Sequence, residues 1–392
     1  MSIRSVLLRA SLALVVLVVG YMLIAPTGRY LLRAGWEEGK ILAHRHPITA
    51  IVADPATTPA VRAKLEVVLA ARAFAADSLG LDAKQSFTTY SQLSHDTLVL
   101  VLSGAYRDRL APVTWWFPIV GRVPYKGFFD FAAARAAARS LESDGYDAYL
   151  RPSPAFSTLG FFNDPLLSTS LADDSLGLAN TVIHELTHNT YYASGQAVFN
   201  ESFANFSGAR GSERFFRSRG DTLAAREVAA RWDDEKVLAQ FWNGLYQSID
   251  SVYRAHPESA AARIAAHDTV YVRARDQLVH DVGPRLRTID TRYLDRVRLD
   301  NAALLAQRIY DTDLDLFDSV YAREDNDPRR AVAQIIGIAK SRPDDPFGAL
   351  RAWVSAGAAA GGAPATPAEP PAMLGTIDNV SLAATGVASF FR

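Results

Sequence analysis

The sequence HELTH at residues 184–188 constrains the fold more than any other stretch of the chain. It lies within the helical pattern LANTVIHELTHNTYY, so His184 and His188 share one helix face, with about 5–6 Å between their Cβ atoms. This spacing suits one zinc ion at about 2.0–2.1 Å from each ring nitrogen. Glu185, beside the first histidine, can take a proton from water that the metal activates. We therefore expect a catalytic Zn²⁺ site on a helix.

A catalytic zinc needs a third protein ligand and keeps one position open. The chain contains no cysteine and its other histidines are distant in sequence, so we expect Glu201, in FNESFANF, to be that ligand. Gly195 can end the first helix and let the chain reverse, and Asn200 can cap a second helix with Glu201 in its opening turn. The alternative is that Glu201 serves only as a favourable partner of the helix dipole.

Asn205 follows Glu201 by four residues and so lies on the same helix face. It can accept a hydrogen bond from the non-ligating nitrogen of His184 or His188, which would orient that ligand. The alternative is a polar side chain on a solvated helix face, and the sequence favours neither.

The N-terminus contains an uncharged stretch from Ala10 to Gly28 with the apolar centre SLALVVLVVGYMLIA. As one helix it would extend about 28 Å, close to the hydrocarbon thickness of a bilayer. The basic residues Arg4 and Arg9 precede it, and no small-x-small cleavage site follows it. We expect an uncleaved signal anchor at residues 1–28 in the inner membrane, with the remainder of the chain on the periplasmic or outer side.

The residues after the anchor predict a small α+β layer. Thr58 and Gly80 are placed to begin and end a helix, and Asp130 is placed to cap an Ala-rich one. TLVLVLS and YDAYLRP are typical of strands, and WWFPIVGRVPY of an edge strand or irregular hairpin. The segment 156–162 is expected to be extended, either as a sheet edge or as a strand that binds substrate backbone.

From residue 173 the pattern is helical almost to the end of the chain, with runs at 176–193, 200–216, 222–255, 258–281, 285–310, 312–323 and 328–340. We therefore expect a mostly helical α+β fold, in which a small irregular sheet packs on a helical domain at residues 29–355. The Ala/Gly/Pro-rich segment from 356 to 372 predicts a linker, followed by a tail that ends at residue 392.

The composition excludes several other kinds of protein. The 41 Lys and Arg residues balance 42 Asp and Glu residues, which argues against a nucleic-acid binder that depends on a basic surface. The absence of cysteine excludes disulfides, thiolate metal sites and a cysteine nucleophile. No Walker loop, nucleophile elbow or dinucleotide-binding glycine pattern is present.

HELTH followed by NESFANF resembles the gluzincin metallopeptidases, whose third metal ligand is a downstream glutamate, and NESFANF is similar to the NEGFA stretch of gluzincin aminopeptidases. The chain more closely resembles a bacterial family of predicted zinc aminopeptidases with an N-terminal anchor. The motifs that carry this resemblance are WWFPIVGRVPYKGFFD, AFSTLGFFNDPLLSTSL, HELTHNTYY, FNESFANF and LDNAALLAQRIYD, and the resemblance as a whole covers roughly residues 29 to 355. Members of the family often carry a lipid-anchored cysteine, which is absent here.

The resemblance implies the same zinc ligands and the same general base as the spacing does, and it implies a peptide substrate. The developing oxyanion needs a hydrogen-bond donor besides the metal, and we expect Tyr125 or Tyr310 to supply it, the alternative being ordinary packing. An aminopeptidase also needs a carboxylate for the free α-amine, and Asp164 is the candidate. Aminopeptidase activity rests on the resemblance, so an open-cleft endopeptidase and a non-catalytic envelope scaffold remain alternatives.

Overall fold

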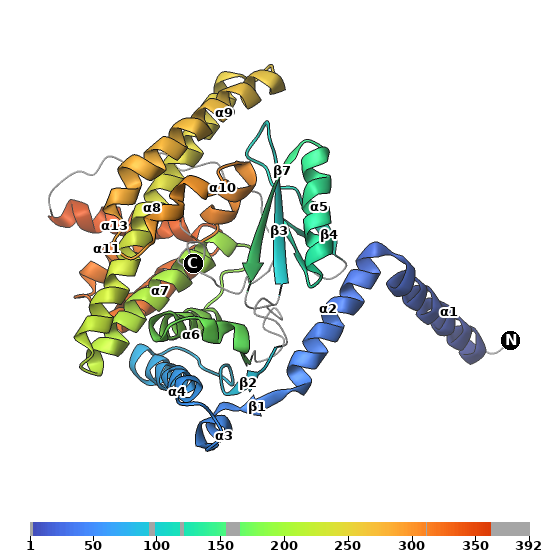
Figure 1. The fold of residues 1–392 in the computed structure, drawn as a ribbon, viewed down its shortest axis with the longest axis horizontal. Coiled ribbons are helices and arrows are strands. Elements are labelled where there is room, and N and C mark those ends of the chain that lie inside the picture. The colour runs from blue at the N-terminus through green and yellow to red at the C-terminus, as the bar shows by residue number, and fades with distance from the viewer. Residues whose placement is uncertain (1–2, 94–98, 118–120, 154–164, 311, 362–392) are drawn as a thin grey trace.

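The computed structural model describes residues 3–93, 99–117, 121–153, 165–310 and 312–361. It has the expected mostly helical α+β architecture, with small irregular sheets beside a large helical body (Figure 1). Its helices are α1 Ile3–Ile24, α2 Pro26–Ala43, α3 Ile48–Ala53, α4 Pro59–Phe74, α5 Phe131–Ser143, α6 Ser175–Thr190, α7 Ala197–Ser218, α8 Thr222–Ala255, α9 Ala260–Gln277, α10 Asn301–Arg308, α11 Leu314–Arg323, α12 Pro328–Ser341 and α13 Pro346–Gly361. Its strands are β1 Arg45–Pro47, β2 Thr89–Ser91, β3 Val99–Tyr106, β4 Trp115–Phe117, β5 Gly121–Val123, β6 Tyr125–Phe128, β7 Tyr146–Ser153 and β8 Leu166–Leu167.

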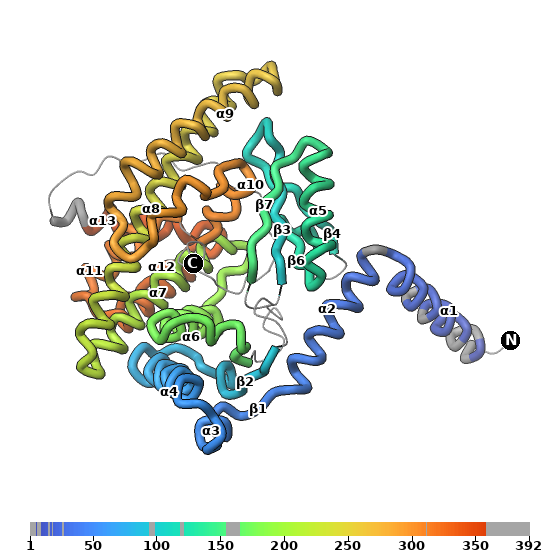
Figure 2. Tube along the Cα trace, viewed as in Figure 1, coloured from blue at the N-terminus to red at the C-terminus, as the bar shows by residue number. Residues whose placement is uncertain are grey.

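The sheet that matters most for function has the strand order β6-β3-β7, and both pairings are antiparallel. On one face Leu102 packs against Ala138 of α5. On the opposite face Ala105 and Tyr149 are buried against α8 and α10. In the tube view α5 and α10 accordingly lie on either side of these strands (Figure 2). Residues on the second face therefore point toward the helical body.

Several local predictions are confirmed. Thr58 caps α4 by accepting a hydrogen bond from the Val61 amide, and Gly80, with φ +74°, follows a single π-helical turn at its end. Asp130 accepts hydrogen bonds from the amides of the first turn of α5. Within WWFPIVGRVPY, the strands β4 and β5 pair antiparallel and β6 begins at Tyr125. Short polar caps and left-handed glycines act through their nearest neighbours, which is why the sequence reveals them.

The helix expected at 285–310 is wrong over most of its length. The structure has two short 3₁₀ segments, Gly283–Arg285 and Thr291–Arg296, before α10 begins at Asn301. The carboxylate of Asp234, buried on α8, accepts hydrogen bonds from the amides of Arg287 and Thr288 at 2.7–3.0 Å. This tertiary contact uses backbone donors that a helix would require.

The predicted boundary before the C-terminal linker also shifts. Helix α13 continues to Gly361, so the first residues of the segment expected to be a linker from 356 are helical. The alanines of that segment have high helix propensity, and the proline-rich part begins later. The rest of the linker and the tail lie outside the described residues.

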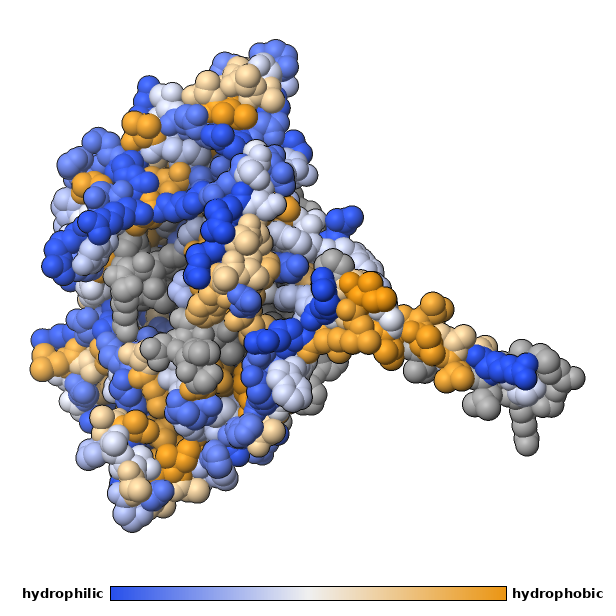
Figure 3. All heavy atoms as spheres, turned by 45° about the vertical axis from the view of Figure 1, so that its right-hand side comes forward, coloured by the Kyte–Doolittle hydropathy of each residue, from blue (hydrophilic) through white to orange (hydrophobic). Residues whose placement is uncertain are grey.

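The single helix expected from Ala10 to Gly28 is broken at Ala25. Pro26 disfavours helical geometry at the preceding residue, and Ala25 has an extended backbone, with ψ 139°. Among the described helices none is by itself long and apolar enough to span a membrane, whereas the pair Arg9–Ile24 and Thr27–Ala43, bent by 86°, meets the criteria of length and composition together. The two helices form an arm on which apolar side chains gather (Figure 3).

The largest core cluster joins α4, α6, α7, α11 and α12, and Phe203, Phe206 and Phe317 stack within it. Helices α6 and α7 approach closely where α7 carries glycine. A Cβ at Gly208 would lie 2.6 Å from Asn180 Oδ1, and one at Gly211 would lie 2.9 Å from Ile183 Cγ2. Glycine at both positions thus allows α7 to lie directly against α6.

A half-buried ionic network ties α7, α8 and α11 together. Asp318 accepts hydrogen bonds from Arg210 at 2.8 Å, from Lys236 at 2.8 Å and from the Trp232 indole at 3.0 Å. Burial alone would raise the pKa of Asp318, but the charge of Arg210 and these hydrogen bonds outweigh burial and hold it below the usual 3.8. The carboxylate is therefore ionised at neutral pH and fully partnered.

We expect Asp318→Asn to lower the free energy of unfolding by about 1–3 kcal/mol at pH 7, because two half-buried cations lose their common counter-ion. Since the folded-state pKa is depressed, this contribution is complete above about pH 4 and fades as the pH falls below the unfolded value. Urea unfolding of the full-length protein in detergent, followed by tryptophan fluorescence, measures the difference. Asp276→Asn, at a side chain that is 79% exposed, is the matched control and should change stability by less than about 0.5 kcal/mol. Equal stability of Asp318→Asn and wild type would contradict the role of Asp318 as the common counter-ion of Arg210 and Lys236.

Candidate metal centre

Helix α6 presents both histidines of the HELTH motif on the face opposite its apolar stripe. Asp174 caps the helix by accepting a hydrogen bond from the Gly177 amide at 2.8 Å. Leu178, Val182 and Ile183 are fully buried in the core. With one side of the helix held in this way, the other side is fixed toward α7.

The turn between α6 and α7 differs from the prediction. Helix α7 begins at Ala197, with Gln196 at the cap position, so Glu201 lies in its second turn. Asn200 does not cap the helix: its side chain makes two hydrogen bonds with the backbone of Ala193, at 2.8 and 2.9 Å. Gly195, with φ +73°, lies inside the turn. Asn200 thus holds the reversal in shape from within the helix.

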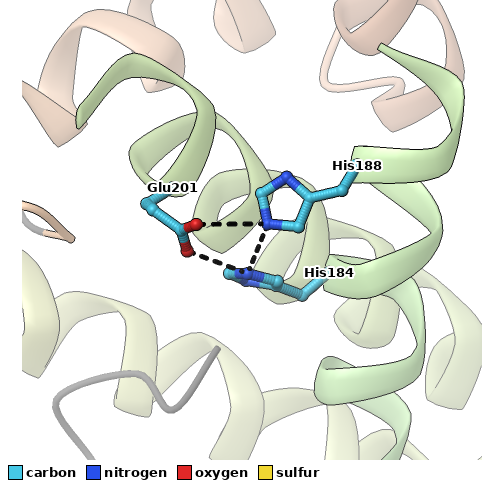
Figure 4. Close-up of side chains that lie close together, drawn as sticks. All are labelled: His184, His188 and Glu201. Carbon is cyan, nitrogen blue, oxygen red and sulfur yellow. Dashed lines mark hydrogen bonds and ion pairs between the residues drawn. The ribbon is translucent and has the colours of Figure 1, made fainter. Parts of the chain in front are cut away.

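This reversal brings Glu201 against the two histidines, as the side chains in Figure 4 show. The Nε2 atoms of His184 and His188 lie 3.1 Å apart, and the Glu201 carboxylate oxygens lie 3.5 and 3.6 Å from them. The exposed fraction is 2% for His184 and 1% for Glu201. Three potential ligand atoms therefore converge within 4.8 Å in the protein interior.

The electrostatics of the group are dominated by the Glu201 carboxylate. Burial opposes ionisation of Glu201, but the two histidines outweigh it and lower its pKa to about 2. Burial likewise opposes protonation of His188, yet the Glu201 charge and hydrogen bond raise the pKa of that imidazole. A buried anion in this position attracts positive charge strongly.

The donor set fits a divalent cation such as zinc. Ligand atoms at about 2.0–2.1 Å from a tetrahedral ion are separated by about 3.3–3.4 Å, close to the three separations in the structure. His188 Nδ1 and Glu201 Oε2 are buried and have no hydrogen-bond partner among the described residues. Unsatisfied buried polar atoms are rare, and a bound cation would account for the carboxylate oxygen.

Both predicted tyrosines lie beside this group. Burial is the main cause that raises the pKa of the Tyr125 and Tyr310 hydroxyls, and the charge of Glu201 raises both further. The Tyr125 hydroxyl is buried without a hydrogen-bond partner among the described residues. The Tyr310 hydroxyl accepts a hydrogen bond from Arg151 Nη2 at 3.1 Å, which leaves its own proton free to be donated elsewhere.

Asn205 contacts Tyr310 and neither histidine. Its amide nitrogen donates to the Tyr310 carbonyl at 3.0 Å, and the Ser202 hydroxyl donates to the same oxygen at 3.2 Å. Within the described ranges no hydrogen bond joins Asn205 to His184 or His188. The face of α7 that carries Glu201 therefore also holds the backbone of Tyr310, a contact between segments that sequence spacing does not reveal.

Two further residues at the site were missed by the sequence reasoning. Tyr192 follows α6; burial first, and then the charge of Glu201, raise its pKa to about 12. Arg151 on β7 is buried, and the signal that could have found it is a charged residue on the inward-facing positions of a strand. Asp164 and the segment 156–162 lie outside the described residues.

Glu185 is adjacent to the first histidine on α6. Its charge contributes to the raised pKa of His188 and, after burial and the charge of Glu201, to that of the Tyr310 hydroxyl. The structure thus brings His184, Glu185, His188 and Glu201 together with Tyr310.

A family model described as "Putative aminopeptidase" matches residues 29–346 of the chain. No curated protein and no solved structure matches the chain significantly.

We expect His184→Ala and Glu201→Gln each to weaken zinc binding more than about 100-fold. Loss of a residue that only hydrogen-bonds to a metal ligand weakens binding up to about 100-fold, and loss of the ligand itself should weaken it more. Competition with a chromogenic chelator on the full-length protein measures the affinity. Glu185→Gln is the control and should retain zinc, because Glu185 is not part of the ligand group. Wild-type affinity in Glu201→Gln would place the third ligand elsewhere.

Proposed function

The chain belongs to the putative aminopeptidase family, and on that premise we propose that it is a zinc-dependent peptidase that removes N-terminal residues from peptides. The observation that carries the proposal is the buried group His184, His188 and Glu201, whose ligand atoms converge with Glu185 next to the first histidine. A site with a purely structural metal would not need a carboxylate at that position. Zinc bound there would polarise the scissile carbonyl and make water easier to deprotonate.

Glu185 is proposed as the general base. Its carboxylate takes a proton from the attacking water and then delivers it to the leaving amine. The influence of its charge on both His188 and Tyr310 supports a position at the reacting centre.

Tyr310 is proposed as the donor to the developing oxyanion. Arg151 occupies the acceptor side of its hydroxyl, so the Tyr310 proton is directed away from Arg151. Asn205 and Ser202 hold its backbone on the helix that carries Glu201, which orients the ring before substrate binds. Tyr125 lies on β6, and its hydroxyl has no partner among the described residues. We propose that this hydroxyl contacts the substrate. For the α-amine we retain Asp164, on the sequence alone.

We expect the full-length, zinc-loaded protein to hydrolyse aminoacyl chromogenic substrates and to leave N-acetylated peptides intact. Glu185→Gln should lower kcat by at least about 10²-fold while zinc stays bound, because the base is lost. Cleavage of N-acetylated peptides would support the endopeptidase alternative. Activity equal to that of Glu185→Gln on every substrate would support the scaffold.

We also propose that α1 anchors the chain in the inner membrane, with the metal centre on the periplasmic side. Leu12, Leu14 and Leu17 of α1 are each more than 60% exposed, which is costly in water and favourable in lipid. The bend at Ala25 would then let the amphipathic α2 lie along the surface of the bilayer.

After cell fractionation, we expect the full-length chain in the membrane fraction, released by detergent and not by high salt. Deletion of residues 1–28 should move it to the soluble fraction, because the exposed apolar helix is lost. A full-length chain that stays in the soluble fraction would contradict the anchor.

A further inference from the structure

Arg151 is a buried cation without an acidic partner. Its side chain is 5% exposed, and within the described part of the chain no carboxylate lies at ion-pair distance from it. Nη2 donates to the Tyr310 hydroxyl at 3.1 Å, whereas Nη1 is buried and has no hydrogen-bond partner among the residues that the structure describes. The half-buried Arg210 differs, because it contacts both Asp318 and Glu213. An unpaired buried charge is costly, so this position requires another explanation than stability.

The strand register places Arg151 on the same side of the sheet as Tyr125. Arg151 lies opposite Val101, and Tyr125 lies opposite Ser103, two residues further along the central strand. Positions two apart share a face, so both side chains lie on the face that points toward the helical body. The Arg151 charge accordingly lowers the pKa of both Tyr125 and Tyr310, against the stronger effect of burial.

The charges of the site leave Arg151 uncompensated. A divalent cation held by the histidines and Glu201 would balance the two carboxylates, Glu185 and Glu201. Arg151 would then leave one positive charge in excess, in a region that holds an unpartnered guanidinium N–H and an unpartnered phenol O–H. Guanidinium groups in such settings bind carboxylates through paired N–H···O contacts.

We propose that Arg151, together with Tyr125, binds a carboxylate of the substrate within one residue of the scissile bond. The proposal rests on the proposed peptidase function and names its substrate class. Nη1 belongs to the same guanidinium whose Nη2 holds Tyr310, the donor assigned to the oxyanion. One extended residue spans about 3.3–3.6 Å, so a carboxylate on Nη1 belongs to the residue next to the cleaved bond. That carboxylate is either the free C-terminus of a dipeptide or an acidic side chain.

The test measures binding to the full-length, zinc-loaded Glu185→Gln protein by calorimetry, which needs no turnover. The probes are leucylglycine, leucylglycinamide and the α-amide of leucylaspartic acid. We expect leucylglycine, the aspartyl probe or both to bind at least about tenfold more tightly than leucylglycinamide, because only those two carry a carboxylate there. A preference for leucylglycine alone identifies a dipeptide terminus, and a preference for the aspartyl probe alone identifies an acidic side chain.

Adding Arg151→Gln should abolish the tenfold preference, whereas Arg151→Lys should retain part of it because the charge remains. Arg122→Gln is the matched control: it removes one positive charge from an exposed position on β5 and should leave the preference unchanged. If Arg151→Gln does not fold, the three probes are compared on Arg151→Lys, and a carboxylate preference that is reduced there supports the proposal.

Equal binding of all three probes would overturn the proposal. It would also be overturned if Arg151→Gln weakened all three probes equally, which would make Arg151 a positioning residue for Tyr310. If the wild-type enzyme is active but the three probes bind equally, the carboxylate site is contradicted and the peptidase function stands. If the protein prefers a carboxylate probe but cleaves no substrate, the carboxylate site stands and the peptidase function is contradicted.

Discussion

The close packing of α7 on α6 is the contact on which the metal centre depends. Two ligands stand on one helix and the third on the other, so neither helix holds the set alone. Gly208 and Gly211 remove the side chains that would separate the helices, and Asn200 holds the turn between them. Because the interior is close-packed, a displacement of α7 by even a fraction of an ångström would move Glu201 relative to both histidines.

Buried charge is handled in two ways in this molecule. Asp318 and Arg210 lie half-buried between helices, and each has more than one oppositely charged or hydrogen-bonding partner. At the candidate metal centre, within the described part of the chain, Glu201 pairs with the two histidines alone, and Arg151 hydrogen-bonds to the Tyr310 phenol alone. Buried charges with too few partners lower the stability of the fold. Such charges are typical of sites where a bound ligand supplies the missing partners.

The small sheet contributes to the centre from the other side. Its outer face is covered by α5, and its inner face carries Tyr125 and Arg151 toward the helical body. Helix α10 packs on the same sheet and ends two residues before Tyr310. The inner face of the sheet thus lies toward the candidate metal ligands, although its three strands are distant from the HELTH motif in sequence.

The sequence by itself determined the features that depend on near neighbours. The four-residue spacing of His184 and His188 follows from the helical repeat, and the caps at Thr58 and Asp130 act within one turn. The sequence also allowed Glu201 to be predicted as the third ligand, because the chain reversal between α6 and α7 is short. The tertiary structure alone decided the partners of Asn205 and of Arg151 among the described residues, and the break in the predicted 285–310 helix. These depend on contacts between segments 50 or more residues apart, and no local pattern encodes such contacts. The bend at Ala25 has a local cause in Pro26, but only the three-dimensional structure gives its angle of 86°.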